Sequence, residues 1–413
     1  MNNENQHIPQ GYKNSPLGII PEDWEVKRLG DLCKKIGSGI TPKGGQNVYL
    51  SQGHPFMRSQ NVANGRLLLD DIVFIDDFTH QKQKSTEIEL DDVLLNITGA
   101  SIGRCAIATQ EIAAGNVNQH VCIIRLKDKT LSHYICTFLL SYVGQKQIDS
   151  YQAGGNREGL NYNQIAAFKI CLPTHGEIIQ INNLLSLWDT AISKQTALIE
   201  KLTQCKRGLM QQLLTGKKRL KGFEGEWKEV KLGEIATFFS GGTPKSSNKS
   251  YYNGDIPFIR SGEIDKNKTE LFISQEGINN SSAKIVEKGD ILYALYGATS
   301  GQCSMSKIRG AINQAILCIK PNANRYFIMS VLQLNKENYY NSYLQGGQGN
   351  LSGEIVSNYI IPIPTNEEQN AIASVLIQAD KEIELANKKL TRLQEQKKGL
   401  MQVLLTGKRR VRL

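Results

Sequence analysis

The chain of 413 residues has no long hydrophobic run and few residues in metal-binding patterns. No stretch reaches the roughly 18 uninterrupted apolar residues of a membrane helix, and the opening MNNENQH is too polar for a secretory signal. The eight cysteines form no Cys-x-x-Cys pair and the six histidines form no His-x-x-x-His pair, which excludes the common zinc motifs. We therefore expect a cytoplasmic protein whose cysteines are buried free thiols.

Signatures of catalysis are missing as well. Neither the Asn-Pro-Pro-aromatic loop nor the Pro-Cys loop of DNA methyltransferases occurs. The Thr-Gly-Lys tripeptide at 215–217 has Gln211 where a phosphate-binding loop needs its first glycine, and no Ser or Thr follows the lysine. No two carboxylates stand out as a general acid and base. We predict a chain with no catalytic activity of its own.

The charge balance favours a polyanionic partner. Lys and Arg total 49 against 39 Asp and Glu, so the formal net charge is +10 and the isoelectric point is near 9.0. Such a balance suits nucleic acid, although many basic proteins bind none. The length predicts two or three domains.

The sequence contains an internal duplication. GLMQQLLTGK at 208–217 returns as GLMQVLLTGK at 399–408 with one letter changed. An ordered duplication of this kind predicts two similar modules. Further pairs keep the same order in both halves: LGDL at 29–32 with LGEI at 232–235, Thr41-Pro42-Lys43 with Thr243-Pro244-Lys245, PFMRS at 55–59 with PFIRS at 257–261, DDVLLNITGASIG at 91–103 with GDILYALYGATSG at 289–301, Asn118-Gln119 with Asn313-Gln314, and Pro173 with Pro364.

Each half begins with a segment of mixed pattern. Alternating apolar residues at 168–172 and 359–363 predict strands, and 291–296 and 315–319 are also strand-like. Apolar residues at 134–139 and 328–332 recur at helical spacing instead. We therefore predict an α+β fold with two mixed sheet-and-helix domains.

A long helix follows each domain. After Pro173 and after Pro364 no proline occurs for some forty residues, and apolar residues recur in steps of three and four. Two helices of about 40 residues would each be roughly 60 Å long. The predicted seam residues are Leu185, Trp188, Ile192, Ile199, Leu202, Leu209 and Leu213 in the first helix, and Leu376, Ile383, Leu390, Leu393, Leu400 and Leu404 in the second.

The seam favours an antiparallel pair. A parallel pair in register would place Lys206 against Lys397 in one core layer. An antiparallel pair instead sets Lys206 opposite Ile383 and Lys397 opposite Ile192, where each lysine can lay its stem on an apolar neighbour and send its charge outward. We predict an antiparallel coiled coil with an internal pseudo-twofold repeat.

Several paired loops allow two interpretations. The loops at 98–104 and 296–301 could bring backbone amides to phosphate or be tight turns that need glycine. The glycine loops at 154–159 and 346–350 could present side chains to base edges or be surface turns. The basic runs at 217–221 and 408–412 could complement the helix dipole or contact DNA or a partner subunit.

Two pairs of polar residues also allow more than one interpretation. Arg58-Ser59 and Arg260-Ser261 could contact phosphate or guanine, or each arginine could pair with a carboxylate of its own domain. Asn118-Gln119 and Asn313-Gln314 could form a buried amide network that braces the sheet.

Four motifs together carry a family resemblance. PEDWEVKRLGDL at 21–32, GITPK at 39–43, PFMRSQNV at 55–62, and the repeated LLTGK with its basic tail resemble the specificity subunits of type I restriction-modification systems. The resemblance covers essentially the whole chain. It implies the following division: an N-terminal tail at 1–22, target-recognition domains at 23–173 and 227–364, coiled-coil helices at 174–216 and 365–406, a basic linker at 217–226 and a basic tail at 407–413.

The resemblance also implies function and partners. Each recognition domain would read one half of an asymmetric bipartite site in double-stranded DNA, and the coiled coil would set the spacing. Two modification subunits would bring S-adenosylmethionine, restriction subunits would bring ATP and Mg, and this chain would hold no cofactor and no metal. Alternatives are a fragment of a fused methyltransferase-nuclease and a coiled-coil scaffold that binds no DNA. The candidate DNA contacts are Lys43, Arg58, Ser59, Asn156 and Arg157 in the first half, and Lys245, Arg260, Ser261 and Gln348 in the second.

Overall fold

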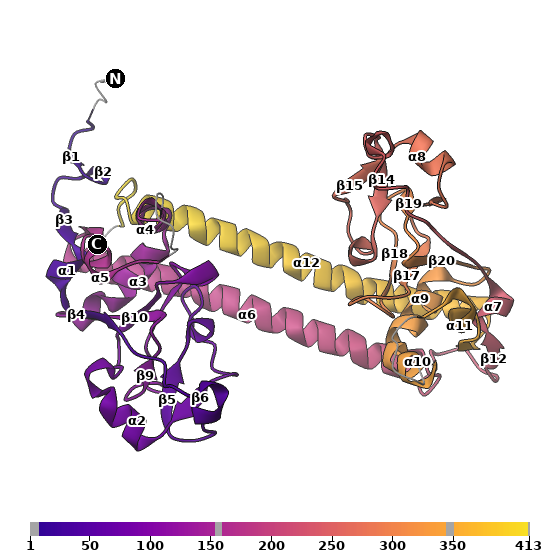
Figure 1. Ribbon diagram of the computed structural model, residues 1–413, viewed down its shortest axis with the longest axis horizontal. Helices are drawn as coiled ribbons and strands as arrows, with labels where there is room; N and C mark the ends of the chain where they lie inside the picture. The colour runs from indigo at the N-terminus through magenta and orange to yellow at the C-terminus, as the bar shows by residue number, and fades with distance from the viewer. Residues whose placement is uncertain (1–7, 153–158, 344–350, 412–413) are drawn as a thin grey trace. The chain divides into compact units, whose positions relative to one another are not determined.

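A computed structural model describes residues 8–152, 159–343 and 351–411 of the chain (Figure 1). Its contacts divide the chain into two units, residues 1–195 with 389–413 and residues 196–388. Each unit holds one mixed domain and one stretch of each long helix, α6 (His175–Leu213) and α12 (Asn366–Leu404). Within the described ranges, no helix has the length and apolar character to cross a bilayer.

The domain of the first unit is built on a four-stranded sheet of order β4-β10-β7-β8. Smaller sheets are β6-β5-β9, β11-β3 and the hairpin β1-β2. The strands are β1 (Tyr12–Ser15), β2 (Gly18–Pro21), β3 (Glu25–Arg28), β4 (Cys33–Ser38), β5 (His54–Met57), β6 (Val73–Ile75), β7 (Val93–Asn96), β8 (Cys105–Ile107), β9 (Asn116–Val117), β10 (Val121–Leu126) and β11 (Lys169–Leu172); the helices are α1 (Leu29–Leu32), α2 (Asp77–Lys82), α3 (Ser132–Leu140), α4 (Tyr142–Ser150) and α5 (Tyr162–Ala166), with 3-10 turns at Gly45–Val48, Ser59–Asn61, Lys84–Thr86, Gly99–Ser101 and Lys129–Leu131.

The domain of the second unit repeats much of this topology, although its second sheet has four strands, in the order β15-β14-β19-β16, where that of the first unit has three. Its first sheet has the order β13-β20-β17-β18, and β12 pairs with β21 as β3 pairs with β11. The elements are β12 (Lys228–Lys231), α7 (Leu232–Ile235), β13 (Ala236–Ser240), β14 (Ile256–Ile259), β15 (Leu271–Ile273), α8 (Gln275–Asn279), β16 (Lys284–Val286), β17 (Ile291–Ala294), β18 (Cys303–Met305), β19 (Gly310–Ile312), β20 (Ile316–Pro321), α9 (Arg325–Leu334), α10 (Lys336–Tyr343), α11 (Gly353–Ser357) and β21 (Ile360–Ile363), with 3-10 turns at Lys249–Tyr252 and Ser261–Glu263.

The inner strand β10 explains the continuous apolar run VCII at 121–124. Cys122 and Ile124 belong to a cluster that includes Phe138 of α3, whereas Val121 and Ile123 belong to the opposite cluster with Met57 and Val117. Both faces are covered, so the strand needs no polar alternation. The strands predicted at 168–172 and 359–363 are confirmed as β11 and β21. The strand predicted at 291–296 is shorter and ends at Ala294.

Both long helices begin and end on the same short phrases. The backbone N–H and the hydroxyl of Thr174 donate to Glu177 Oε2 at 3.3 and 3.0 Å, and Thr365 with Glu368 repeats the Thr-x-x-Glu spacing of a capping box. At the other ends, Gly216 and Gly407 have φ of +68° and +70°, the left-handed conformation that stops a helix. The repeated LLTGK phrase is therefore a helix stop.

Within the first unit, the start of α6 packs against the end of α12. Asp189 Oδ1 lies 2.5 Å from Lys397 Nζ. Glu177, in the first turn of α6, binds Arg410, which follows the end of α12, at 2.7 Å. Residue numbers rise along one helix as they fall along the other, so the two stretches are antiparallel.

Within the second unit, the end of α6 packs against the start of α12 in the same sense. Lys206 Nζ lies 2.5 Å from Asp380 Oδ1, and Arg219, just after α6, binds Glu368 in the first turn of α12 at 2.6 Å. The fold class predicted from the sequence is confirmed: two mixed domains, an internal repeat, and long helices that pair antiparallel within each unit.

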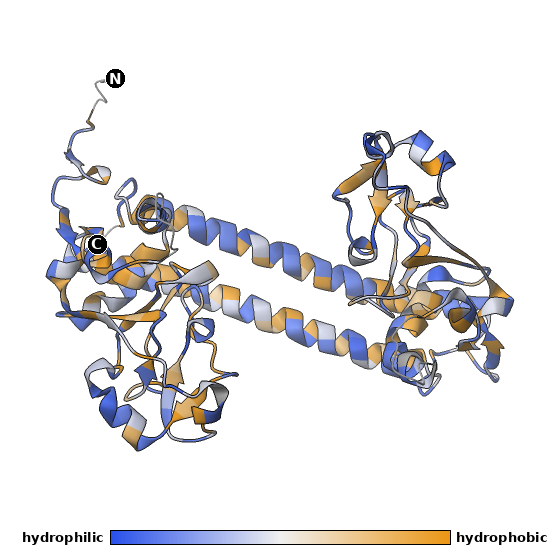
Figure 2. Ribbon diagram, in the orientation of Figure 1, coloured by the Kyte–Doolittle hydropathy of each residue, from blue (hydrophilic) through white to orange (hydrophobic). Residues whose placement is uncertain are grey.

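The side chains predicted for the seam are all at least partly buried, and apolar residues alternate with polar ones along both helices (Figure 2). Four are buried, namely Leu185, Leu213, Leu376 and Leu404. The others are of intermediate exposure: Trp188, Ile192, Ile199, Leu202, Leu209, Ile383, Leu390, Leu393 and Leu400.

The cysteines are free thiols, and seven of the eight are buried. Burial raises the pKa of Cys33, Cys122 and Cys171 to about 12, so these thiols are unreactive near neutral pH. The expectation of burial is wrong for Cys205, which is exposed because it lies on α6 outside the seam.

Candidate nucleic-acid interface

Three loops of the first unit meet at one end of the four-stranded sheet. Ser38, the last residue of β4, pairs with Cys122 near the start of β10, and Asn96, the last residue of β7, pairs with Val121. Because these strands are antiparallel, the segments 39–43, 97–103 and 118–120 all lie at the same end of the sheet. We call these three segments the loop end of the first domain.

The second unit has the same arrangement. Ser240, the last residue of β13, pairs with Leu317, and Ala294, the last residue of β17, pairs with Ile316. Segments 241–245, 295–301 and 313–315 therefore form the loop end of the second domain. They contain the second copies of the motifs found in the first.

A glycine starts the Thr-Pro-Lys loop in each domain because no side chain fits there. A Cβ on Gly39 would lie 1.7 Å from the carbonyl oxygen of Val117, and a Cβ on Gly241 would lie 1.8 Å from that of Ile312. The backbone of each loop thus lies directly against the strand beside it. The same Ser-Gly pair precedes each loop in the sequence, as Ser38-Gly39 and Ser240-Gly241.

The candidate lysines lie just beyond these glycines. Lys43 and Lys245 are exposed, and neither has an ion-pair partner within the part of the chain that the structure describes. Thr41, two residues before Lys43, donates its backbone N–H to Gln119 Oε1 at 3.1 Å, and its hydroxyl donates to the same oxygen. A cationic side chain on a held loop is suited to contact a DNA phosphate.

The candidate arginine of the first domain is held by its own domain. Arg58 Nη2 donates to the carboxylate of Asp71 at 3.2 Å and to the Asp71 carbonyl at 2.7 Å, and its guanidinium lies 5.6 Å from the ring centre of Tyr49. Ser59 begins a short 3-10 helix and is of intermediate exposure. Of the two alternatives for Arg58, this geometry favours the ion pair within the domain.

The equivalent arginine of the second domain is held in the same way. Arg260 Nε donates to Glu263 at 3.1 Å, and Arg260 Nη2 donates to Glu270. Burial acts to raise the pKa of Glu263, but the hydrogen bonds from Arg260 outweigh it and the pKa is lowered. Ser261 begins a 3-10 helix, as Ser59 does.

Within each Asn-Gln pair, the asparagine and the glutamine have different roles. Asn118 Oδ1 accepts the backbone N–H of His120 at 3.0 Å, and Asn313 Oδ1 accepts that of Ala315 at 3.2 Å. The asparagines therefore close the turns before β10 and β20. The glutamines are exposed and reach the Thr-Pro-Lys loops instead.

Three further candidates, Asn156, Arg157 and Gln348, lie outside the described residues. In both domains, a described residue shortly after these candidates forms a backbone hydrogen bond with the loop end. Leu160 donates its N–H to the carbonyl of Ile97 at 2.9 Å, and Leu351 donates to the carbonyl of Leu295 at 2.9 Å.

The basic runs contain arginines with a structural role that the sequence did not indicate. Glu177, with 1 % of its side chain exposed, accepts hydrogen bonds from Arg410 Nε at 2.7 Å and from Trp24 Nε1 at 2.8 Å. Burial acts to raise the pKa of Glu177, but hydrogen bonds from Arg410, Trp24 and Thr174 outweigh it and the pKa is lowered. The cluster fastens the start of α6 to the tail that follows α12.

The second unit contains the same cluster. Glu368, also 1 % exposed, accepts from Arg219 Nε at 2.6 Å and from Trp227 Nε1 at 3.2 Å. Of each basic run, therefore, one arginine is used inside its own unit.

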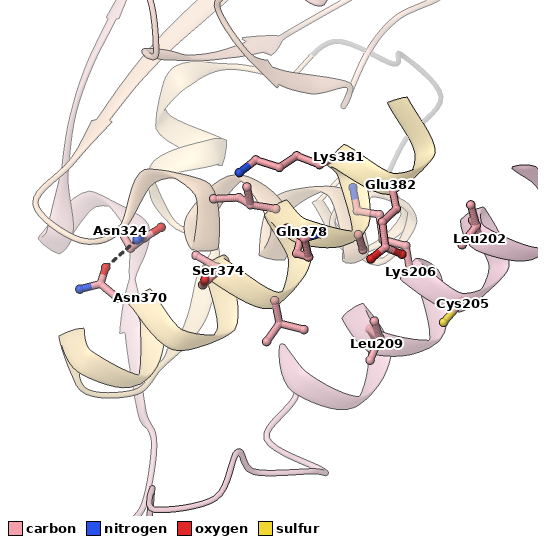
Figure 3. A pocket seen from close by; sticks show the side chains of 14 residues that line it. Leu202, Cys205, Lys206, Leu209, Asn324, Asn370, Ser374, Gln378, Lys381 and Glu382 are labelled. Atoms are coloured by element: carbon pink, nitrogen blue, oxygen red, sulfur yellow. Dashed lines mark hydrogen bonds between the residues drawn. The ribbon is translucent and has the colours of Figure 1, made fainter. Parts of the chain in front are cut away.

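A groove of about 650 Å³ lies between α6 and α12 in the second unit (Figure 3). Leu202 and Leu209 line it from α6 and Gln378 from α12, and Asn324 Nδ2 donates to Asn370 Oδ1 at 2.7 Å at one side. The charged residues of its lining are Lys206, Lys381 and Glu382. In the described ranges, no three His, Cys, Asp or Glu side chains are placed to hold a metal ion.

Comparison with known proteins gives a consistent result. The family model for the type I restriction modification DNA specificity domain matches the chain twice, at residues 21–204 and 224–395. A chain of Methanocaldococcus jannaschii assigned to the MjaX type I restriction enzyme as its specificity subunit is 26% identical, over 98% of this chain and 97% of its own length. The MjaVIII specificity subunit of the same organism is 24% identical over 95% and 94%. The crystal structure of a type I S subunit from M. genitalium shares the fold, with a TM-score of 0.55 and 15% identity over 92% of this chain and 96% of its own.

Proposed function

The chain belongs to the family of type I restriction modification DNA specificity domains and carries two copies, and from this premise we propose that each copy reads one half of a split DNA site. It is a specificity subunit, a DNA-recognition component without catalysis of its own. The recognition domains proposed are residues 23–173 and 227–364. The observation that carries the proposal is the loop end, because the same three loops gather at the same end of the same sheet in both units.

The two half-sites should differ. The loop ends share their Thr-Pro-Lys segments but differ around them, since Ile40 stands where the second domain has Gly242 and His120 where it has Ala315. Different side chains at the reading surface select different base edges. We therefore propose an asymmetric bipartite target, with Lys43 and Lys245 on phosphates and the glycine loops that contain Asn156, Arg157 and Gln348 closer to bases.

The long helices are proposed to set the spacing between the half-sites. Each runs without interruption for 39 residues, and ion pairs and buried carboxylates join the two helices in both units. A helix pair clamped at several points can transmit a fixed distance, because a helix rises about 1.5 Å per residue.

Catalysis is proposed to come from partners. Specificity subunits of this class act with other restriction-modification subunits and with DNA. We propose that two modification subunits supply S-adenosylmethionine and adenine methylation, and that restriction subunits supply ATP-driven translocation and cleavage with Mg. Activity on chromosomal DNA would place the complex in the cytoplasm.

A domain exchange tests the reading function. Residues 23–173 are replaced by the first recognition domain of another specificity subunit, and methylated bases are sequenced in a host that also carries the partner subunits. We expect one half of the methylated motif to change and the other half to remain. A change in both halves, or in neither, would contradict the assignment of one half-site to each domain.

A second experiment tests the spacer. Matched heptads are inserted into α6 and α12 so that the seam stays in register. We expect the number of unread bases between the half-sites to increase, and an unchanged gap would remove the spacer role.

The alternative of a scaffold that binds no DNA is tested separately. If the chain reads DNA, the affinity of the assembled complex for DNA should fall steeply with salt. Methylation by the isolated chain would instead support a fused methyltransferase fragment.

A further inference from the structure

The exposed glutamine of each Asn-Gln pair is bonded inward, toward the neighbouring loop of its own domain. In the first domain, Gln119 Oε1 accepts both the backbone N–H and the hydroxyl of Thr41. In the second, Gln314 Oε1 accepts the hydroxyl of Thr243. Glutamine at a DNA-reading surface commonly binds adenine through its amide, but here the carbonyl end of the amide is already occupied.

The hydrogen bonds of Gln119 have a fixed direction. A backbone N–H can only donate, so the oxygen of the Gln119 amide must face Thr41. The amide nitrogen then faces His120, whose Nε2 lies 3.0 Å away and must accept. His120 Nδ1 therefore carries the proton and donates to the hydroxyl of Thr98. One chain of hydrogen bonds thus joins the loops 39–43, 118–120 and 97–103.

The chain of hydrogen bonds ends beside the glycine loop. Thr98 forms a β-bridge with Gly159, the first described residue after the segment that contains Asn156 and Arg157. Gln119 thus connects the loop of Lys43, through His120 and Thr98, to Gly159.

The second domain keeps the first step of this chain and has changed the rest. Thr243 and Gln314 match Thr41 and Gln119, whereas Ala315 stands in place of His120 and Tyr296 in place of Thr98. The contact between threonine and glutamine is therefore common to both domains although its surroundings differ. A residue that read a base directly would be expected to vary between two domains with different targets.

We propose that Gln119 and Gln314 are positioning residues for DNA recognition: each holds the Thr-Pro-Lys loop of its own domain in place and does not itself read a base. The proposal rests on the function proposed above. Gly39 and Gly241 fix one side of each loop against a strand, and the glutamine fixes the other. Without the glutamine, the lysine and the adjoining loops would lose a common orientation, and contacts across the whole half-site would weaken.

Four variants of the full chain test the proposal, each assembled with its modification subunits. Gln119→Leu removes both hydrogen-bonding ends of the side chain at similar size, and Gln119→Glu keeps the acceptor for Thr41. Gln314→Leu is the matched change in the other domain. Gln110→Leu is the control, because Gln110 is an exposed glutamine that follows β8 at the opposite end of the sheet.

The target motif is first identified by sequencing methylated bases. Binding is then measured to two libraries of DNA duplexes that carry this motif, each with one of its two half-sites randomised. For Gln119→Leu we expect affinity through one half-site to fall about tenfold, as for the loss of hydrogen bonds that order a contact surface, with selectivity weakened at all its positions. Gln314→Leu should weaken the other half-site. Gln119→Glu keeps the acceptor for Thr41 but loses the donor to His120, and its charge repels phosphate; it should therefore bind more weakly but keep the selectivity of the wild type at that half-site. Gln110→Leu should match the wild type in both affinity and selectivity.

Two results would overturn the proposal. One is a wild-type profile for both leucine variants. The other is a change of preference at a single base position that Gln119→Glu does not restore, which would identify the glutamine as a direct base reader. Equal melting temperatures for all variants are required, so that a loss of folding is not read as a loss of positioning. If the wild-type complex itself fails to select either half-site, the proposed function has failed, and that outcome is distinct from the other two.

Discussion

Lys206 Nζ of α6 lies 2.5 Å from Asp380 Oδ1 of α12, and Lys397 Nζ of α12 lies 2.5 Å from Asp189 Oδ1 of α6. Lysine matches lysine and aspartate matches aspartate at the same repeat offset of 191 residues, so the two ion pairs are copies of one another. The sequence predicted that each lysine would send its charge outward past an isoleucine. The charge instead meets a carboxylate of the partner helix one turn away, because a lysine stem is long enough to reach it.

Reversal of one of these charges should weaken the second unit. Lys206→Glu places a carboxylate beside Asp380 and should lower the free energy of unfolding by about 1 kcal/mol, since the pair is partly exposed. Lys206→Glu combined with Asp380→Lys should recover part of that loss in thermal denaturation, because Asp380 also accepts a hydrogen bond from the Tyr326 hydroxyl, which the exchange removes. Lys201→Glu, on an exposed position of the same helix, serves as the control. A double variant no more stable than the sum of its single changes would show that the pair contributes nothing.

Loss of the tail arginine should destabilise the first unit. Arg410→Ala leaves Glu177 buried without its cation and should cost about 3 kcal/mol, because an unpaired buried charge is strongly unfavourable. Arg409→Ala removes an exposed neighbour in the same tail and should change stability by less than about 0.5 kcal/mol. Chemical denaturation monitored by tryptophan fluorescence compares the two, since Trp24 contacts the same carboxylate. Equal effects would mean that Arg410 acts only through net charge.

The same carboxylate should make stability depend on acid. The pKa of Glu177 in the folded chain is lowered from its ordinary value of 4.5. A group with a lowered folded-state pKa contributes its stability above the unfolded pKa, and the contribution is lost as the pH falls below about 4.5 through the folded value. Glu177→Gln should therefore lose stability at pH 7 and show a flatter decline below about pH 4.5. Unfolding curves between pH 3 and 7 measure this, and parallel declines for the two proteins would contradict it.

Replacement of glycine by alanine should have opposite effects on stability at two kinds of site. Gly39→Ala drives a methyl group into the Val117 carbonyl and should cost about 2 kcal/mol or more. Gly208→Ala and Gly399→Ala place the methyl group in open space within α6 and α12, and each should stabilise the chain by about 0.5–1 kcal/mol. Melting temperatures of the three variants decide the matter. Destabilisation by Gly208→Ala would contradict the open space beside this glycine.

The sequence by itself determined the features that depend on neighbours along the chain. The duplication is visible in matched letters, and the long helices follow from apolar steps of three and four between Pro173 and the glycine stop at Gly216. Strands such as β11 and β21 follow from alternation that ends at proline. Each of these is a local property, because helix and strand periodicities are read within one element.

The tertiary structure decided the features that join distant residues. Glu177 meets Arg410 across 233 positions, and Lys206 meets Asp380 across 174; no period within one helix indicates which charge of another helix lies opposite. Strand order likewise brings the loops after β4 and β7 together at the start of β10. For that reason the sequence named Thr41 and Gln119 in separate motifs, and only the folded sheet places one within hydrogen-bond distance of the other.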